Sequence, residues 1–265
     1  MSATVLTFRR MKEESRKIVL LTAYDWLLAR YLADAGVDGI LVGDSVGQVF
    51  AGHPSTLPVT LDDMIYHARA VRRGAADHFL IVDMPFLSFQ ISTAETLRNA
   101  GRVLKETNAQ AVKLEGGARI AETVSRLVES GIPVMGHLGL TPQSVHAFGG
   151  YGLRASEEQE SARLKEDART LDQAGCFAIV LEKIPRDLAA TVTAEVGAPT
   201  IGIGAGPDTD GQVLVTPDLL GLTPGFRARH VRRYADLDTA IGEALRRFAE
   251  DVREGRFPGD AESWA

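Results

Sequence analysis

The chain has 265 residues, 45% of them hydrophobic and 24% charged, as is usual for one large globular domain or two small ones. Its net charge of −6 argues against a nucleic-acid or anionic membrane partner, because such partners attract basic surfaces. The single cysteine, Cys176, has no partner for an internal disulfide, which fits a reducing compartment. The first apolar run, residues 18–23, is too short for a secretory or membrane-spanning segment, so we expect a cytoplasmic protein.

Short apolar runs alternate with segments of helical periodicity along the whole chain. Runs of Val, Ile and Leu without polar alternation indicate strands that are buried on both faces, as in a parallel sheet. The predicted strands are residues 18–22, 39–42, 79–82, 111–114, 133–137, 178–181, 200–203 and 212–215.

This alternation, repeated eight times, predicts an α/β fold, a closed (β/α)8 TIM barrel that forms a single domain over residues 1–265. An additional amphipathic helix is expected near the C-terminus, with one apolar face formed by Ile241, Ala244, Leu245, Phe248 and Val252. An open doubly wound sheet is the structural alternative. Such a sheet normally has a glycine-rich first turn, whereas residues 23–25 read Ala-Tyr-Asp here.

Charged residues stand at or just after the ends of several predicted strands. In a barrel the carboxyl ends of all strands open on one face, where active sites are built, so these side chains should converge. A carboxylate at the end of a buried strand is costly unless it is paired, metal-bound or exposed. The residues concerned are Asp44, Asp83, Glu115, His137 and Glu182, together with Lys113, which lies two residues before Glu115 and so on the same strand face.

Each of these residues also has a bland interpretation. Asp44 and Asp83 can be turn or cap acids, Lys113 and Glu115 a buried ion pair, and His137 a hydrogen-bonded core histidine. Glu182 can be a solvated loop charge. Their shared location in the predicted architecture favours one common site over all of these interpretations together.

Two aspartates and a glutamate without a cysteine or histidine cluster suit a hard cation such as Mg²⁺, which prefers oxygen ligands. Such an ion would act as a Lewis acid on a bound keto acid and stabilise an enolate. In this hypothesis Lys113 pairs with the substrate carboxylate or the developing oxyanion, and Glu182 remains free to act as a general base.

Eight motifs, spread in order over nearly the whole chain, resemble those of the 3-methyl-2-oxobutanoate hydroxymethyltransferase (ketopantoate hydroxymethyltransferase) family. Any one motif is weakly specific, but together they are highly specific. They are residues 21–25 (LTAYD), 41–45 (LVGDS), 55–60 (STLPVT), 112–117 (VKLEGG), 136–143 (GHLGLTPQ), 148–151 (FGGY), 202–206 (GIGAG) and 210–215 (DGQVLV).

The resemblance implies a (β/α)8 barrel that transfers a one-carbon unit from 5,10-methylenetetrahydrofolate to 3-methyl-2-oxobutanoate, giving 2-dehydropantoate and tetrahydrofolate on the route to pantothenate. It implies the metal ligands, substrate-binding residues and catalytic base as well as a homo-oligomer, typically a decamer of two pentameric rings. The implied Mg²⁺ ligands are Asp44, Asp83 and Glu115, the keto-acid contacts are Asp44, Ser45, Asp83, Lys113 and His137, and the proton acceptor is Glu182.

The chain departs from the family pattern at two places near the expected site. Residues 152–155 read Gly-Leu-Arg-Ala where the family more often has Lys-Val-Gln-Gly, and Lys183 follows the expected base where a small residue or cysteine is commoner.

Two other functions compete with the transferase. One is a Mg²⁺-dependent carbon–carbon lyase of the phosphoenolpyruvate mutase and isocitrate lyase type, although the Lys-Lys-Cys-Gly-His segment usual in its lyases is absent. The other is a barrel that binds a ligand without catalysis.

Overall fold

Eight parallel strands form a closed barrel in the computed structural model, which describes residues 3–264. Each strand pairs with its neighbours in chain order, and β8 pairs with β1 to close the sheet. This confirms the predicted TIM barrel and rules out the open sheet. The strands are β1 (Ile18–Thr22), β2 (Gly39–Val42), β3 (Leu80–Asp83), β4 (Ala111–Glu115), β5 (Val134–Gly139), β6 (Ala178–Glu182), β7 (Thr200–Ile203) and β8 (Gly211–Leu214).

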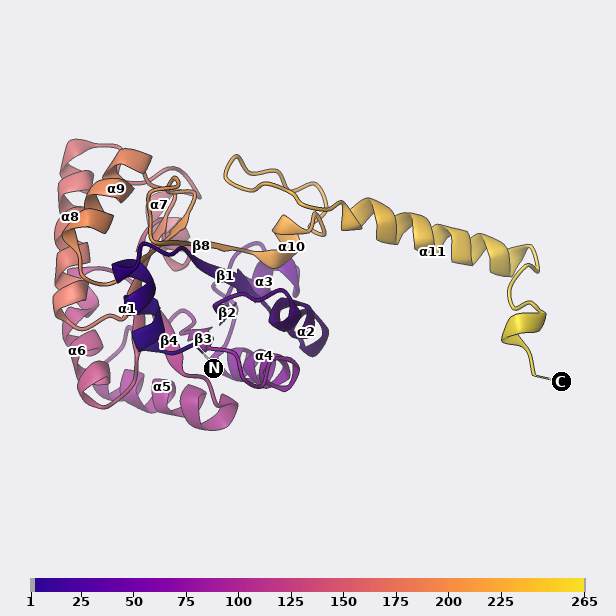
Figure 1. Ribbon diagram of the computed structural model, residues 1–265, viewed down its shortest axis with the longest axis horizontal. Coiled ribbons are helices and arrows are strands. Elements are labelled where there is room, and N and C mark those ends of the chain that lie inside the picture. Colours follow the sequence, from indigo (N-terminus) through magenta and orange to yellow (C-terminus); the bar gives the residue numbers. More distant parts are fainter. Residues whose placement is uncertain (1–2, 265) are drawn as a thin grey trace. The chain divides into compact units, whose positions relative to one another are not determined.

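Helices alternate with the strands along the chain and cover the outside of the barrel, as α5, α6 and α8 do in Figure 1. Short 3-10 turns, η1 (Ala118–Ile120) and η2 (Pro142–Ser144), lie in the loops after β4 and β5. The helices of this part of the chain are α1 (Val5–Glu13), α2 (Trp26–Asp34), α3 (Val46–Val49), α4 (Leu61–Gly74), α5 (Thr93–Thr107), α6 (Ala121–Glu129), α7 (Val145–Phe148), α8 (Glu158–Gln173) and α9 (Arg186–Glu195).

Two apolar cores result from the period-two alternation of side chains along the strands. One lies between the barrel and its helices and takes residues such as Val82, Leu114 and Leu181. The other fills the barrel interior and takes the alternate strand residues, such as Ile81 and Val180. Because alternate residues of a strand share a face, the interior rows that contain Ile81 and Val180 continue to Asp83 and Glu182 at the carboxyl ends.

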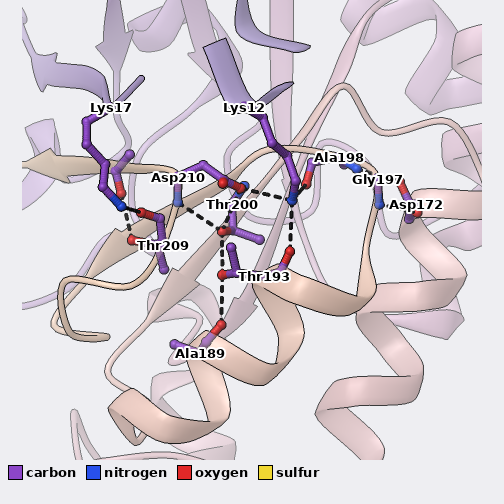
Figure 2. Close-up of polar contacts among 11 residues, drawn as sticks. Lys12, Lys17, Asp172, Ala189, Thr193, Gly197, Ala198, Thr200, Thr209 and Asp210 are labelled. Carbon is purple, nitrogen blue, oxygen red and sulfur yellow. Dashed lines mark hydrogen bonds and ion pairs between the residues drawn. The ribbon is translucent and has the colours of Figure 1, made fainter. Parts of the chain in front are cut away.

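Helix α1 is joined to the interior core at the amino ends of the strands. Its Phe8 and Met11 are buried there, and the Phe8 ring lies 5.2 Å from that of Phe79. Figure 2 shows that Lys12, also from α1, reaches toward β7 and the start of β8. Its ammonium donates to the carbonyl oxygens of Thr193 (2.9 Å) and Ala198 (3.2 Å) and lies 3.0 Å from Asp210 Oδ2.

We expect Lys12→Met to lower the free energy of unfolding by about 2–4 kcal/mol, because two carbonyls and a largely buried carboxylate lose their cationic donor. Urea denaturation followed by circular dichroism would measure the loss. Arg9→Met is the matched control on the same helix, since the Arg9–Glu13 pair is exposed and should contribute at most about 0.5 kcal/mol. Equal losses in both variants would show that the Lys12 contacts do not stabilise the barrel.

The contacts divide the chain into two compact units, Met1–Val215 and Thr216–Ala265. The second contains α10 (Thr216–Leu219), α11 (Leu237–Arg253) and the 3-10 turn η3 (Asp260–Glu262). The additional C-terminal helix is thereby confirmed as α11, while one domain over residues 1–265 stays a prediction. No helix among the described residues is long and apolar enough to cross a membrane.

Candidate active site

The strand register brings the charged residues of β3 to β6 into one layer at the carboxyl end of the barrel. Asp83 is paired in register with Lys113, and Glu115 with His137. Glu182 ends β6 and is paired with Gly139, the last residue of β5. Four strands therefore present their charged side chains at one mouth, as the sequence pattern predicted.

Asp44, Asp83 and Glu115 form a buried acidic cluster at this mouth. The backbone N–H of Asp44 donates to Asp83 Oδ2 over 3.1 Å, which links the ends of β2 and β3. Burial raises the pKa of Asp44 well above its ordinary value, and the charges of Asp83 and Glu115 raise it further. The three carboxylates thus repel one another in a site that is poorly solvated.

Lys113 is the cation at the centre of the cluster. Its Nζ lies 3.0 Å from Asp83 Oδ1 and 3.1 Å from His137 Nδ1, and the side chain is almost fully buried. Burial alone would lower the pKa of Lys113, but the charges of Asp83, Glu115 and Asp44 outweigh burial and raise it. Lys113 therefore carries a positive charge that only partly compensates three carboxylates.

His137 connects this cluster to Glu182. Its Nε2 lies 3.2 Å from Glu182 Oε2, an ion-pair distance without a well-directed hydrogen bond, and its Nδ1 lies 3.5 Å from Glu115 Oε1. Burial and the Lys113 charge lower the pKa of His137, but contacts with the Glu115 and Glu182 carboxylates prevail and raise it. Whether His137 is neutral with Nδ1 accepting from Lys113 or fully protonated, Nε2 carries the hydrogen that faces Glu182.

Gln143, in the loop after β5, holds the acidic cluster together and has no counterpart among the predicted site residues. Its Nε2 donates to Asp44 Oδ2 and to the Met84 carbonyl, both over 2.9 Å, and its backbone N–H donates to Glu115 Oε2 over 3.0 Å. Gln90 Nε2 in turn donates to the side-chain amide oxygen of Gln143. The residue stands in the motif of residues 136–143, but no strand pattern marks a loop side chain that folds back into the site.

We expect Gln143→Leu to lower turnover by about 10- to 100-fold, as is usual when a residue that orients catalytic carboxylates is removed. The variant keeps the approximate size of the side chain but leaves Asp44 Oδ2 without its amide donor. Steady-state kinetics measures the effect. The neighbouring Ser144→Ala, which removes a hydroxyl lacking any such contact with the acids, is the control. Equal rates for Gln143→Leu and the wild type would show that the amide does not position the acids.

Ser45, the predicted substrate contact, lies beside the same cluster. A Cβ on Gly43 would fall 2.8 Å from Ser45 Oγ and 3.5 Å from Asp83 Oδ2, so both oxygens face the space next to this glycine. Tyr24, which follows β1, has its hydroxyl 2.8 Å from Ser45 Oγ. The carbonyl of Tyr24 is in turn 2.6 Å from Nδ1 of buried His67. Tyr24 is therefore a second positioning residue that the sequence did not reveal.

The two departures from the family pattern contact each other in the structure. Lys183 Nζ donates to the carbonyl of Tyr151, and the Lys183 carbonyl accepts from the backbone N–H of Arg154 over 2.8 Å. Tyr151 OH also accepts from Gln48 Nε2 over 3.2 Å. The Lys183 ammonium thus points toward the divergent loop, and hydrogen bonds connect this loop to Lys183, the residue directly after Glu182.

Within residues 3–264, no group of three or more His, Cys, Asp or Glu residues has an arrangement that could hold a metal ion. The acidic cluster nevertheless has the chemistry of a site for a hard cation: three buried carboxylates against one ammonium, with raised pKa values for Asp44 and Asp83. Mg²⁺ commonly binds through one or two carboxylates plus water and substrate oxygens, so three converged protein ligands are not required.

The fold and the charged barrel mouth define a class of (β/α)8 enzymes with an acidic site at the carboxyl ends of the strands. Phosphonopyruvate hydrolase, solved with oxalate and Mg²⁺, superposes with a TM-score of 0.62 at 13% identity over 98% of this chain and 93% of its own. The 2,3-dimethylmalate lyase, a member of the PEP mutase/isocitrate lyase superfamily, superposes with a TM-score of 0.60 at 18% identity over 100% and 93%. At such identities the likeness shows the fold alone.

Sequence comparison identifies the family within this class. The chain belongs to the ketopantoate hydroxymethyltransferase family, whose model matches residues 2–260. Proteins named 3-methyl-2-oxobutanoate hydroxymethyltransferase are 58% identical in Prosthecochloris aestuarii, over 96% of this chain and 93% of theirs, and 55% identical in Salinibacter ruber, over 98% of both. The resemblance stated from the motifs is confirmed, and membership of this family outweighs the lyase alternative.

Proposed function

We propose that this chain transfers a one-carbon unit from 5,10-methylenetetrahydrofolate to 3-methyl-2-oxobutanoate. With water, the products are 2-dehydropantoate and tetrahydrofolate, so that C3 of the keto acid loses a hydrogen and gains a hydroxymethyl group. The observation that carries the proposal is the buried Asp44–Asp83–Lys113–Glu115 cluster next to Glu182 at the barrel mouth. The names of the family and of its relatives support the substrate.

The cluster of Asp44, Asp83 and Glu115 would hold the divalent cation, which we propose is Mg²⁺, through one or two of these carboxylates together with water and substrate oxygens. Their excess of negative charge over Lys113 and their resistance to ionisation are the features that a cation would relieve. When bound, the cation would supply Lewis-acid polarisation of the keto oxygen, which makes the hydrogen on C3 more acidic. Gln143 would orient Asp44 and Glu115 for this task, since it donates to both carboxylates.

Lys113 and Ser45 would fix the keto acid. The Lys113 ammonium is held at the centre of the site by Asp83 and His137, where it can pair with the substrate carboxylate or with the oxyanion that develops on the keto oxygen. The Ser45 hydroxyl, positioned by Tyr24, can donate to the same anionic groups. Both contacts would hold C3 at a constant position relative to Glu182.

Glu182 would remove the proton from C3. It is the acid at the mouth that contacts neither Lys113 nor Gln143, and its partner in the site is His137 Nε2. The hydrogen on that nitrogen faces the carboxylate and orients it for proton removal. Water would release the one-carbon unit from both folate nitrogens at the oxidation level of formaldehyde, and the C3 carbanion equivalent would attack that carbon. The oxygen of the water would become the product hydroxyl, and the proton taken up by Glu182 can return to it.

We expect exhaustive chelation to abolish turnover and added Mg²⁺ to restore it. The measurement is the rate of 2-dehydropantoate formation in metal-free buffer before and after titration with Mg²⁺. Circular dichroism of the chelated protein is the control, because the fold should not change. Full activity in the chelated protein would remove the cation from the proposal, while the same chelated protein without activity after Mg²⁺ addition would point to a different ion.

We also propose a homo-oligomer, and by family resemblance a decamer. In α11 no residue is buried, and Leu245 and Phe248 of its predicted apolar face are more than half exposed, which supports an apolar partner surface.

A further inference from the structure

The segment of residues 149–154, which carries Tyr151, is held at the barrel mouth from two sides. It leaves α7 through Gly149 and Gly150, whose φ angles of +70° and +134° suit glycine and few other residues. On one side Tyr151 OH accepts from Gln48 Nε2 of α3, and on the other side the Tyr151 carbonyl accepts from Lys183 Nζ at the end of β6. Groups that follow β2 and β6 therefore fix one and the same residue.

The Tyr151 hydroxyl is a donor that faces the acidic site. The bond from Gln48 uses its oxygen as an acceptor, so the hydroxyl hydrogen is left for another acceptor. Burial raises the pKa of Tyr151, and the charges of Asp44 and Glu182 raise it further against the lowering effect of the Gln48 bond. The phenol thus stays protonated, and it lies within electrostatic reach of carboxylates on both sides of the mouth.

Gln48 connects this phenol to the residues proposed to bind the keto acid. Its backbone N–H donates to the Ser45 carbonyl over 2.9 Å, within the turn that begins at Asp44. The side-chain amide that holds Tyr151 therefore belongs to the same turn as Ser45. With 38% of Tyr151 exposed, the phenol stands at the rim, between the site and the solvent.

Lys183 fixes the other side of the segment from an unusual backbone conformation. Its φ is +45°, a left-handed value that a residue with a side chain adopts only where its surroundings hold it there. Its backbone N–H donates to the Ile203 carbonyl over 2.9 Å, and its carbonyl accepts from the Arg154 N–H over 2.8 Å. Within residues 3–264 the Lys183 ammonium forms no ion pair, so it contacts the Tyr151 segment and does not neutralise Glu182.

We propose that Lys183 is a positioning residue that holds the Tyr151 hydroxyl over the bound keto acid, where the phenol donates a hydrogen bond to the anionic oxygens of the substrate. The inference rests on the proposed function, because it takes the keto acid to lie among Asp44, Lys113 and Glu182. A neutral donor adds a charge-assisted hydrogen bond to the substrate without adding charge to the site. The divergent residue after the base and the divergent loop then act together as one device.

The test is the dissociation constant for 3-methyl-2-oxobutanoate, measured by isothermal titration of the full-length protein with Mg²⁺ and without folate, together with steady-state kinetics. Tyr151→Phe and Lys183→Met should each weaken keto-acid binding by about tenfold and leave kcat within about twofold. The double variant should also lose about tenfold, because one hydrogen bond is lost once. Lys183→Arg, which still carries a donor, should recover most of the affinity. Lys105→Met, which alters an exposed lysine on α5, is the matched control.

Lys183→Gly separates the side chain from the backbone. Glycine accepts a φ of +45° and keeps the carbonyl that Arg154 contacts, so the melting temperature should stay close to that of the wild type while keto-acid binding weakens as in Lys183→Met. Losses that multiply to about 100-fold in the double variant would show that Lys183 does not act through Tyr151. Wild-type affinity in every variant would overturn the inference and leave the proposed function intact. A wild-type protein that binds no 3-methyl-2-oxobutanoate would overturn both.

Discussion

Glu182→Gln should lower folate-dependent turnover by about 10²–10⁴-fold and leave the affinity for 3-methyl-2-oxobutanoate nearly unchanged. The substitution keeps the size of the side chain and a partner for His137 Nε2, but it removes the basicity. A positioned general base contributes about 3–5 kcal/mol to lowering the barrier, and this contribution exists only in the transition state. The expected signature is therefore a loss in kcat with little change in keto-acid binding.

Steady-state kinetics and equilibrium titration of the keto acid measure the two quantities separately. Glu166→Gln, which alters an exposed glutamate on α8, is the matched control and should keep wild-type kcat. A Glu182→Gln enzyme with wild-type kcat would show that another group removes the proton. A variant that loses keto-acid affinity in proportion to rate would make Glu182 a binding residue instead.

Asp44→Asn should abolish most activity and yet leave the metal-free protein at least as stable as the wild type. The asparagine oxygen can still accept from Gln143 Nε2, so the packing is retained. Activity should fall by at least about 100-fold, because a proposed cation ligand worth several kcal/mol of transition-state stabilisation is lost. Stability should not fall, because the variant removes a buried charge that faces Asp83 and Glu115.

The direction of the pH effect distinguishes this explanation from a structural role for Asp44. Burial and neighbouring acids raise the pKa of Asp44 above its ordinary value near 3.8, so the folded protein binds a proton more tightly than the unfolded chain. Ionisation of Asp44 therefore lowers the stability of the wild type as the pH rises from about 3.8 through the pKa of the folded state. Thermal melts should show the advantage of Asp44→Asn at neutral pH and its disappearance below about pH 4. A large drop in melting temperature at neutral pH would make Asp44 structural.

The barrel was predictable because strands buried on both faces read as continuous apolar runs. All eight predicted strands occur within about one or two residues of their expected ends. The shared location of Asp83, Lys113, Glu115, His137 and Glu182 followed from the same logic, since parallel strands of a closed barrel end at one mouth. The metal and catalytic roles of these residues stay predictions, because contacts alone do not reveal chemistry.

Loop side chains were the part that the sequence could not place. Gln143 lies in the loop after β5, where no periodicity fixes the direction of a side chain, and its partner Asp44 is distant in sequence. Lys183 and the loop at residues 152–155 stood out as separate departures from the family pattern. That they contact each other depends on β5 and β6 being neighbours, which only the folded chain shows.

Hydrogen exchange at C3 of 3-methyl-2-oxobutanoate in heavy water, followed by proton NMR without folate, tests the central claim most directly. The wild-type protein with Mg²⁺ should replace the C3 hydrogen with deuterium, and chelation or Glu182→Gln should slow the exchange by at least about 100-fold. Exchange at the wild-type rate in the chelated protein and in Glu182→Gln would contradict the account, because neither the acidic cluster nor Glu182 would then be needed to remove the proton.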